Sequence, residues 1–153
     1  MSRSLRWTGL LGLFVLAAAF TACVGSDDSE DGESSGGGGD AQAITVTLGD
    51  PHEFAIQLSS ATASAGEVTY TVTNSGALPH SFAIVRHEGD PSSLPVTGVD
   101  VDAAQVEILG DTGPLDPGAS GTVTVELEPG AHVVFSNTSG HYTAGMFAPF
   151  TVE

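Results

Sequence analysis

Hydrophobic and polar residues alternate along much of the chain after residue 40. Within each alternating segment every second side chain is apolar, as in Val68, Tyr70 and Val72. This pattern is typical of β-strands that bury one face. Strands are predicted at 44–48, 54–58, 68–73, 81–86, 104–109, 122–128, 131–136 and 149–152. We therefore expect about eight short strands, and no period of 3.6 residues indicates a helix in this part of the chain.

Turn-forming residues separate the predicted strands. They are Gly49-Asp50-Pro51, Asn74-Ser75-Gly76, Gly89-Asp90-Pro91, Asp116-Pro117-Gly118 and Pro129-Gly130. Short strands at regular spacing, each with one apolar face, predict an all-β domain. The expected architecture is a Greek-key β-sandwich over residues 41–153, which is large enough to bury a core without disulfides.

The first 22 residues have the pattern of an export signal. Arg3 and Arg6 precede an apolar stretch over 10–20, which is too short to span a bilayer comfortably, and small residues lead to Cys23. The segment resembles the lipobox of prokaryotic lipoproteins, which implies removal of residues 1–22 and lipidation of Cys23. The alternative is an ordinary signal peptide with an incidental cysteine. In either case we expect export, and lipidation would anchor the chain to the cell membrane, facing the periplasm or the cell exterior.

Residues 23–40 are expected to be a tether. After Cys23, the segment contains six acidic residues and six glycines but no aromatic residue. Such a composition cannot bury a core and is typical of a disordered linker. It would hold the domain at 41–153 a short distance from the membrane.

The charge balance excludes several function classes. The chain has 19 acidic residues against three basic ones, and in 41–153 Arg86 alone opposes 13 acids. Nucleic-acid binding is excluded, because it requires Lys and Arg side chains to neutralise phosphates.

With a single Cys, the chain cannot form an internal disulfide or a Cys-rich zinc site.

Two segments contain residues of the types that bind transition metals. His80 lies just before a predicted strand. His141 and Met146 lie in the segment between the last two predicted strands. With their flanks, Leu115-Asp-Pro-Gly118 and Glu128-Pro-Gly130, these segments resemble the cupredoxins, the family of blue copper proteins. The resemblance covers nearly all of 41–153.

The resemblance implies a set of copper ligands. In this family an early histidine is joined by a cysteine, a second histidine and a methionine from the C-terminal loop. The corresponding residues here are His80, His141 and Met146, and Ser136 occupies the position of the cysteine. Four residues lie between 136 and 141 and four between 141 and 146, which fits the longer-loop members of the auracyanin and rusticyanin type.

Serine at position 136 changes the expected chemistry. The thiolate of a blue copper site dominates its colour and its redox coupling, whereas a hydroxyl is a hard and normally neutral donor. His80, His141 and Met146 can still hold copper, with Ser136 or water in the remaining position. We therefore expect a membrane-tethered copper protein with a nearly colourless site and a redox or metal-handling role. Its partner would be a redox protein or a copper donor or acceptor.

Other functions remain open at this stage. One is a metal-free interaction module with an apolar patch around Tyr142, Met146 and Phe147. A second is a conventional electron carrier, and a third is a site for another metal such as zinc. An enzyme is not expected, because Ser136 and His141 lack an identifiable third member or an oxyanion loop.

Overall fold

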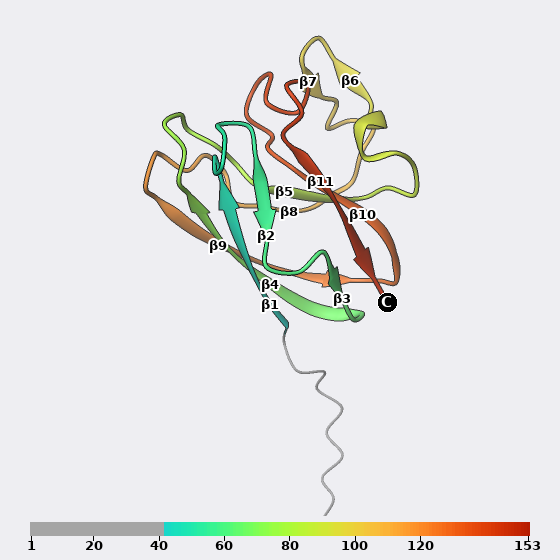
Figure 1. Cartoon of the computed structure of the whole chain (residues 1–153). Coiled ribbons are helices and arrows are strands. Elements are labelled where there is room, and N and C mark those ends of the chain that lie inside the picture. Colours follow the sequence, from blue (N-terminus) through green and yellow to red (C-terminus); the bar gives the residue numbers. More distant parts are fainter. Residues whose placement is uncertain (1–41) are drawn as a thin grey trace, which may run out of the picture. The chain divides into compact units, whose positions relative to one another are not determined.

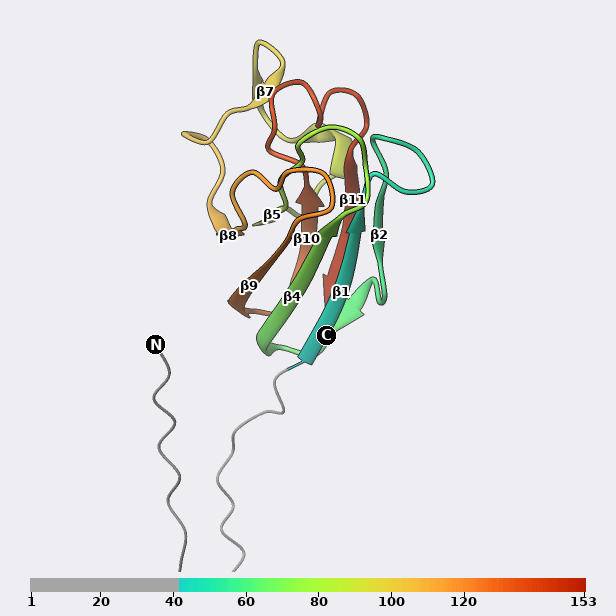
Figure 2. The ribbon, with the colours of Figure 1, turned by 90° about the vertical axis from the view of Figure 1, so that its left-hand side faces the viewer.

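Residues 42–153 are described by a computed structural model, and they form two packed β-sheets (Figure 1). The first sheet contains, in spatial order, β2 (Ile56–Leu58), β1 (Gln42–Leu48), β4 (Gly66–Asn74) and β9 (Ser120–Leu127). The second contains β3 (Thr62–Ala63), β11 (Phe147–Val152), β10 (Gly130–Phe135), β5 (Ala83–Arg86) and β8 (Ile108–Asp111). Figure 2 shows the first sheet in front of β10 and β11. The predicted all-β sandwich is confirmed.

Two small elements lie outside the two sheets. β6 (Val96–Thr97) and β7 (Asp100–Val101) form a separate hairpin, and a short 3-10 helix spans Pro91–Ser93. No helix in residues 42–153 is both long and apolar enough to cross a membrane. The predicted signal segment 1–22, Cys23 and the linker to residue 40 lie outside the described residues.

The core lies between the facing sheets, and the alternating pattern places it there. On β4 the side chains of Val68, Tyr70 and Val72 are fully buried, while the intervening threonines are not. β4 is an interior strand of its sheet, since it pairs in parallel with β1 and antiparallel with β9. From the second sheet, Val134 and Phe150 complete the same core cluster.

The strand predicted at 104–109 is wrong over most of its length. Residues 103–105 form a turn, and β8 begins only at Ile108. The carboxylate of Asp102 accepts hydrogen bonds from the Ala104 backbone nitrogen at 3.0 Å and from the Gln105 side chain at 2.6 Å. This side chain–backbone bond offers the chain a turn in place of a strand, despite the alternating pattern.

Other strand boundaries also shift. The segment predicted at 54–58 is a strand only over Ile56–Leu58, because residues 53 and 54 form a turn. Eight of the strands are at least three residues long, which matches the expected number, and the two-residue strands β3, β6 and β7 were not predicted.

Two buried tyrosines differ in how their hydroxyls are satisfied. Within residues 42–153, the Tyr70 hydroxyl is buried without a hydrogen-bond partner, and burial raises the pKa of this phenol. The Tyr142 hydroxyl accepts from the Leu94 backbone nitrogen at 2.9 Å and donates to the Pro91 carbonyl at 2.8 Å. An unsatisfied buried hydroxyl carries a desolvation cost that a bonded one does not.

We therefore predict that replacing these two tyrosines with phenylalanine changes the free energy of unfolding in opposite directions. Tyr70→Phe should raise the free energy of unfolding by about 1 kcal/mol, because it removes a hydroxyl that gains nothing from burial. Tyr142→Phe should lower it by about 1–3 kcal/mol, because it leaves a backbone nitrogen unpaired. Urea unfolding of both variants measures the two changes. If Tyr70→Phe lost as much stability as Tyr142→Phe, the Tyr70 hydroxyl could not be unpaired as described.

Candidate metal centre

The candidate site lies where the start of β5 meets the end of β10. These strands pair antiparallel, with Phe135 opposite Ala83. Ser136, directly after β10, therefore lies beside the residues directly before β5. The Ser81 backbone nitrogen donates a hydrogen bond to the Ser136 hydroxyl oxygen at 3.2 Å. The Ser81 hydroxyl also accepts from Thr138 at 3.4 Å, so Ser81 connects the two segments.

His80 is held by backbone pairing with Leu115. The His80 nitrogen donates to the Leu115 carbonyl at 3.1 Å, and the Leu115 nitrogen donates to the His80 carbonyl at 2.7 Å. The fully buried Asn74 side chain donates to the carbonyls of Leu78 and Leu115, both at 2.8 Å. Asn74, predicted as part of a turn, thus organises the loop that leads to His80. The His80 side chain is fully buried.

The loop between β10 and β11 is closed by its own backbone. The Ser136 nitrogen donates to the Met146 carbonyl at 3.1 Å, and the Met146 nitrogen donates to the His141 carbonyl at 3.0 Å. The loop is also attached to the β6–β7 hairpin, because the Gly140 nitrogen donates to the Asp100 carboxylate at 3.1 Å. Met146 is fully buried and belongs to the main core cluster. The two ends of the loop are therefore held together.

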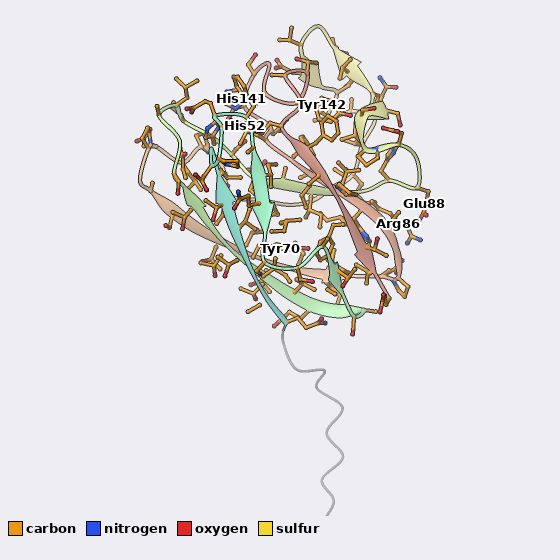
Figure 3. All side chains as sticks on the ribbon, in the orientation of Figure 1. His52, Tyr70, Arg86, Glu88, His141 and Tyr142 are labelled. Carbon is orange, nitrogen blue, oxygen red and sulfur yellow. The ribbon has the colours of Figure 1, made fainter. Side chains whose placement is uncertain are left out.

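Three of the predicted site residues converge. The Nδ1 atoms of His80 and His141 are 3.0 Å apart, and the Ser136 hydroxyl oxygen is 3.2 Å from His141 Nδ1. All three residues are buried, and His141 retains 8% exposure. In Figure 3, His141 lies at the upper end of the sandwich, with Arg86 and Glu88 at the side. Two ring nitrogens at this distance either share a proton or present both lone pairs to one cation.

The surroundings of His141 favour its neutral form. Burial lowers the pKa of His141, the neighbouring His80 lowers it further, and Glu53 acts in the opposite direction. The ring of Phe54 packs edge-on against that of His141, with centroids 5.3 Å apart. Neutral imidazole is the form that binds metals, so these surroundings are compatible with ligation.

Glu53 is a site residue that the sequence analysis missed. Its Oε1 atom is 3.0 Å from His80 Nε2, and it accepts hydrogen bonds from the backbone nitrogens of Ala77 and Leu78 at 3.0 and 2.8 Å. These backbone bonds lower the pKa of Glu53. No sequence pattern predicts the contact, since Glu53 and His80 lie 27 residues apart in different loops.

Two glycines allow this contact to form. A Cβ atom on Gly76 would lie 2.7 Å from both His80 Nε2 and Glu53 Oε1. Gly49 has a φ of +77°, and a Cβ there would lie 2.4 Å from the Gly76 Cα. The backbones of the two loops therefore pack directly beside the His80–Glu53 hydrogen bond, where no side chain fits.

Tyr142 and two further histidines, His87 and His132, make contacts outside the convergent site. Tyr142 is 4% exposed and packs against Phe135 and Phe147 in the second core cluster, so it belongs to the core. His87 is hydrogen-bonded to Ser93 at 2.9 Å, and Nδ1 of the buried His132 is 3.1 Å from the Gly130 carbonyl oxygen. Neither histidine joins the candidate site.

The convergent side chains are donors of types that can bind copper. Within residues 42–153, no group of three or more His, Cys, Asp or Glu side chains is arranged to hold a metal ion. The convergent donors are instead two imidazole nitrogens and a hydroxyl, with a thioether nearby in the chain. Imidazole suits Cu(II), and thioether sulfur suits Cu(I).

Comparison with known proteins identifies the fold. The structure is similar to dithionite-reduced auracyanin from Roseiflexus castenholzii, with a TM-score of 0.59 and 26% identity over 75% of this chain and 99% of that one. The cupredoxin fold is confirmed. Auracyanin A from Chloroflexus aurantiacus, a "blue" copper protein, matches at a TM-score of 0.53 and 18% identity over 72% of this chain and 98% of its own.

Rusticyanin from Thiobacillus ferrooxidans has the same fold. It matches at a TM-score of 0.55 and 20% identity over 75% of this chain and 79% of its own. No family model matches the sequence, and no curated protein matches it either. The cupredoxin fold is one of copper-binding electron-transfer proteins, and this chain places His80, Ser136 and His141 together within it.

The close packing of Gly76 gives a test of the site's architecture. Gly76→Ala should lower the free energy of unfolding by about 1–3 kcal/mol, because its Cβ would overlap the His80–Glu53 pair. Ser75→Ala, on an exposed neighbour in the same loop, should have little effect. Urea unfolding measures both changes. Equal stability of Gly76→Ala and the native chain would show that the loops are not packed as described.

Proposed function

We propose that the chain is a membrane-tethered copper-binding protein with a redox or metal-handling role. The observation that supports this most strongly is the convergence of His80 Nδ1, His141 Nδ1 and the Ser136 hydroxyl at buried positions. In this proposal His80 and His141 are the principal ligands, and Met146 contributes the thioether. Ser136, or a water molecule beside it, takes the position of the family's cysteine.

The proposed site would differ from a blue copper centre in its chemistry. Copper bound there would supply a redox-active cation, but the soft anionic sulfur that retains Cu(I) would be missing. The chain's own residues hold the imidazoles in place from two directions: the Leu115 bridge fixes His80, and the closed 136–146 loop fixes His141. We propose a weaker and nearly colourless site, in which rapid electron transfer is not the main role.

The sequence pattern of residues 1–23, which resembles a lipoprotein signal, supports the proposed membrane tether. Lipidation of Cys23 would anchor the chain, and the acidic segment that follows would separate the copper-binding domain from the membrane surface. The exported chain would then exchange electrons or copper with a partner protein at that surface.

A metal-free interaction module is the second candidate function. It is favoured by the ability of His80 and His141 to satisfy each other with one shared proton. The apolar patch that this alternative predicted around Tyr142, Met146 and Phe147 is wrong, because Tyr142 and Met146 are buried. The large apolar side chains exposed in residues 42–153 are instead Leu78, Val96 and Val99.

Copper titration tests the proposal directly. The purified chain should take up copper saturably at one site, with an electron paramagnetic resonance signal but no intense blue absorption. His80→Ala and His141→Ala should each remove this site, because each deletes an imidazole ligand. His87→Ala serves as the matched control, since His87 is bonded to Ser93 outside the site.

The variant Ser136→Cys shows whether the native chain lacks only the cysteine ligand or the whole copper site of the fold. A blue band should appear on adding copper to this variant, because the thiolate would complete the ligand set of the fold. Absence of saturable uptake by the native chain would refute the copper proposal. Uptake that His80→Ala and His141→Ala leave unchanged would place the bound copper outside the proposed site and would also refute the proposal.

The tether can be tested in the cell. Cys23→Ser should move the protein from the membrane fraction to the soluble exported fraction, because the lipid attachment point is lost. Val24→Ala, which retains the cysteine, should stay in the membrane fraction. Immunoblotting of separated fractions gives the result, and membrane retention of Cys23→Ser at the size of the cleaved chain would contradict lipid anchoring.

A further inference from the structure

The carboxylate of Glu53 occupies a specific position relative to the proposed ligands. It lies at Nε2 of His80, whereas His141 and Ser136 lie on the Nδ1 side of the site. Glu53 contacts His80 from the β1–β2 loop and so cannot compete with the imidazoles for the same ion. Glu53 therefore acts on His80 through the ring nitrogen opposite the one that faces His141.

The contact determines which nitrogen of His80 holds the proton. Every hydrogen bond made by the Glu53 carboxylate is one that it accepts, from the backbone nitrogens of Ala77 and Leu78 and from His80. Because this oxygen accepts, His80 Nε2 must be the protonated nitrogen of the neutral ring. The lone pair of His80 is thereby left on Nδ1, the atom that faces His141.

The position of the negative charge is also informative. Blue copper sites have a thiolate, whose charge offsets that of the metal, but Ser136 normally provides no charge. Among the contacts of the convergent residues, the Glu53 carboxylate is the group that brings negative charge, through its 3.0 Å bond to His80. His80 is fully buried and Glu53 is 29% exposed, so the bond is partly shielded from water.

The surroundings show that this contact is built into the fold. Gly49 and Gly76 pack so tightly beside it that a side chain on either would overlap a neighbouring atom. The backbone of the 75–79 loop donates two bonds to the same carboxylate. Both loops that meet at Glu53 are therefore shaped around its bond to His80.

We propose that Glu53 is a positioning residue with two effects: it holds His80 as the Nε2–H tautomer, and it supplies the negative charge that the site lacks without a cysteine ligand. This inference rests on the proposed copper function. A carboxylate hydrogen-bonded to a ligand histidine raises the basicity of that ligand. A doubly charged cation gains more from a nearby anion than a singly charged one, so Glu53 favours Cu(II) over Cu(I).

Two substitutions separate the effects. Glu53→Gln keeps a carbonyl oxygen that can accept from His80 but removes the charge, whereas Glu53→Ala removes both. Glu67→Gln is the matched control, because Glu67 is exposed on β4 and the substitution changes the net charge equally. Thermal unfolding of each variant verifies that the fold is retained.

The first measurement requires no copper. In the chelator-treated chain, nitrogen-15 NMR of labelled histidines should show His80 as a single Nε2–H tautomer in the native protein and in Glu53→Gln. In Glu53→Ala, His80 should become a mixture of tautomers. A single unchanged tautomer in Glu53→Ala would overturn the positioning effect, whatever the result of the copper experiments.

The second measurement compares the two oxidation states of copper. Glu53→Gln should bind Cu(II) about tenfold more weakly, within the 10–100-fold range expected for a partner of a metal-ligating histidine. Its affinity for Cu(I) should change less. Equal weakening for both ions, or none for Cu(II), would overturn the charge effect. Failure of the native chain to bind copper would refute the proposed function, while the NMR result would still decide the positioning effect.

Discussion

Antiparallel pairing of β5 with β10 is the contact on which the candidate site depends. The register that puts Phe135 opposite Ala83 brings the residues before β5 to the residue after β10. Because His80 precedes β5 and Ser136 follows β10, the backbone hydrogen bonds between these two strands set how the two residues lie relative to each other. His141 then reaches the same place through a loop whose ends are tied at Ser136 and Met146. Backbone hydrogen bonds therefore hold all three residues together in the structure.

The packing around this contact explains the buried polar groups of the site. Asn74, His80 and Ser136 are each fully buried, and each has hydrogen-bond partners within the described residues. Burial of such groups is unfavourable unless they are paired, so the site can exist only as a connected network. Glu53 completes this network from the β1–β2 loop. The same network would orient two imidazole lone pairs toward one cation, which is why we favour copper binding over a metal-free role.

Much of the fold could be predicted from the sequence, because its strands alternate apolar and polar residues. Val68, Tyr70 and Val72 are a clear case, since all three face the core. The strand that the alternation predicted at Ala104 is wrong, because the Asp102 side chain stabilises a turn there by accepting a hydrogen bond from the Ala104 backbone nitrogen. His80, Ser136 and His141 were predicted as site residues through the resemblance of their segments to the cupredoxins, and the structure brings the three together. Glu53 could not be found in this way, because its contact depends on how two separate loops pack.

The central claim is that one copper ion binds between His80 and His141 without a sulfur anion. Extended X-ray absorption fine structure of the copper-loaded native chain, compared with that of His80→Ala, tests it most directly. Surface carboxylates offer only oxygen ligands, and His80→Ala removes only an imidazole of the proposed site. Our account predicts imidazole nitrogens around the copper and no short copper–thiolate bond in the native chain. A copper environment made of oxygen alone, without imidazole, would contradict it.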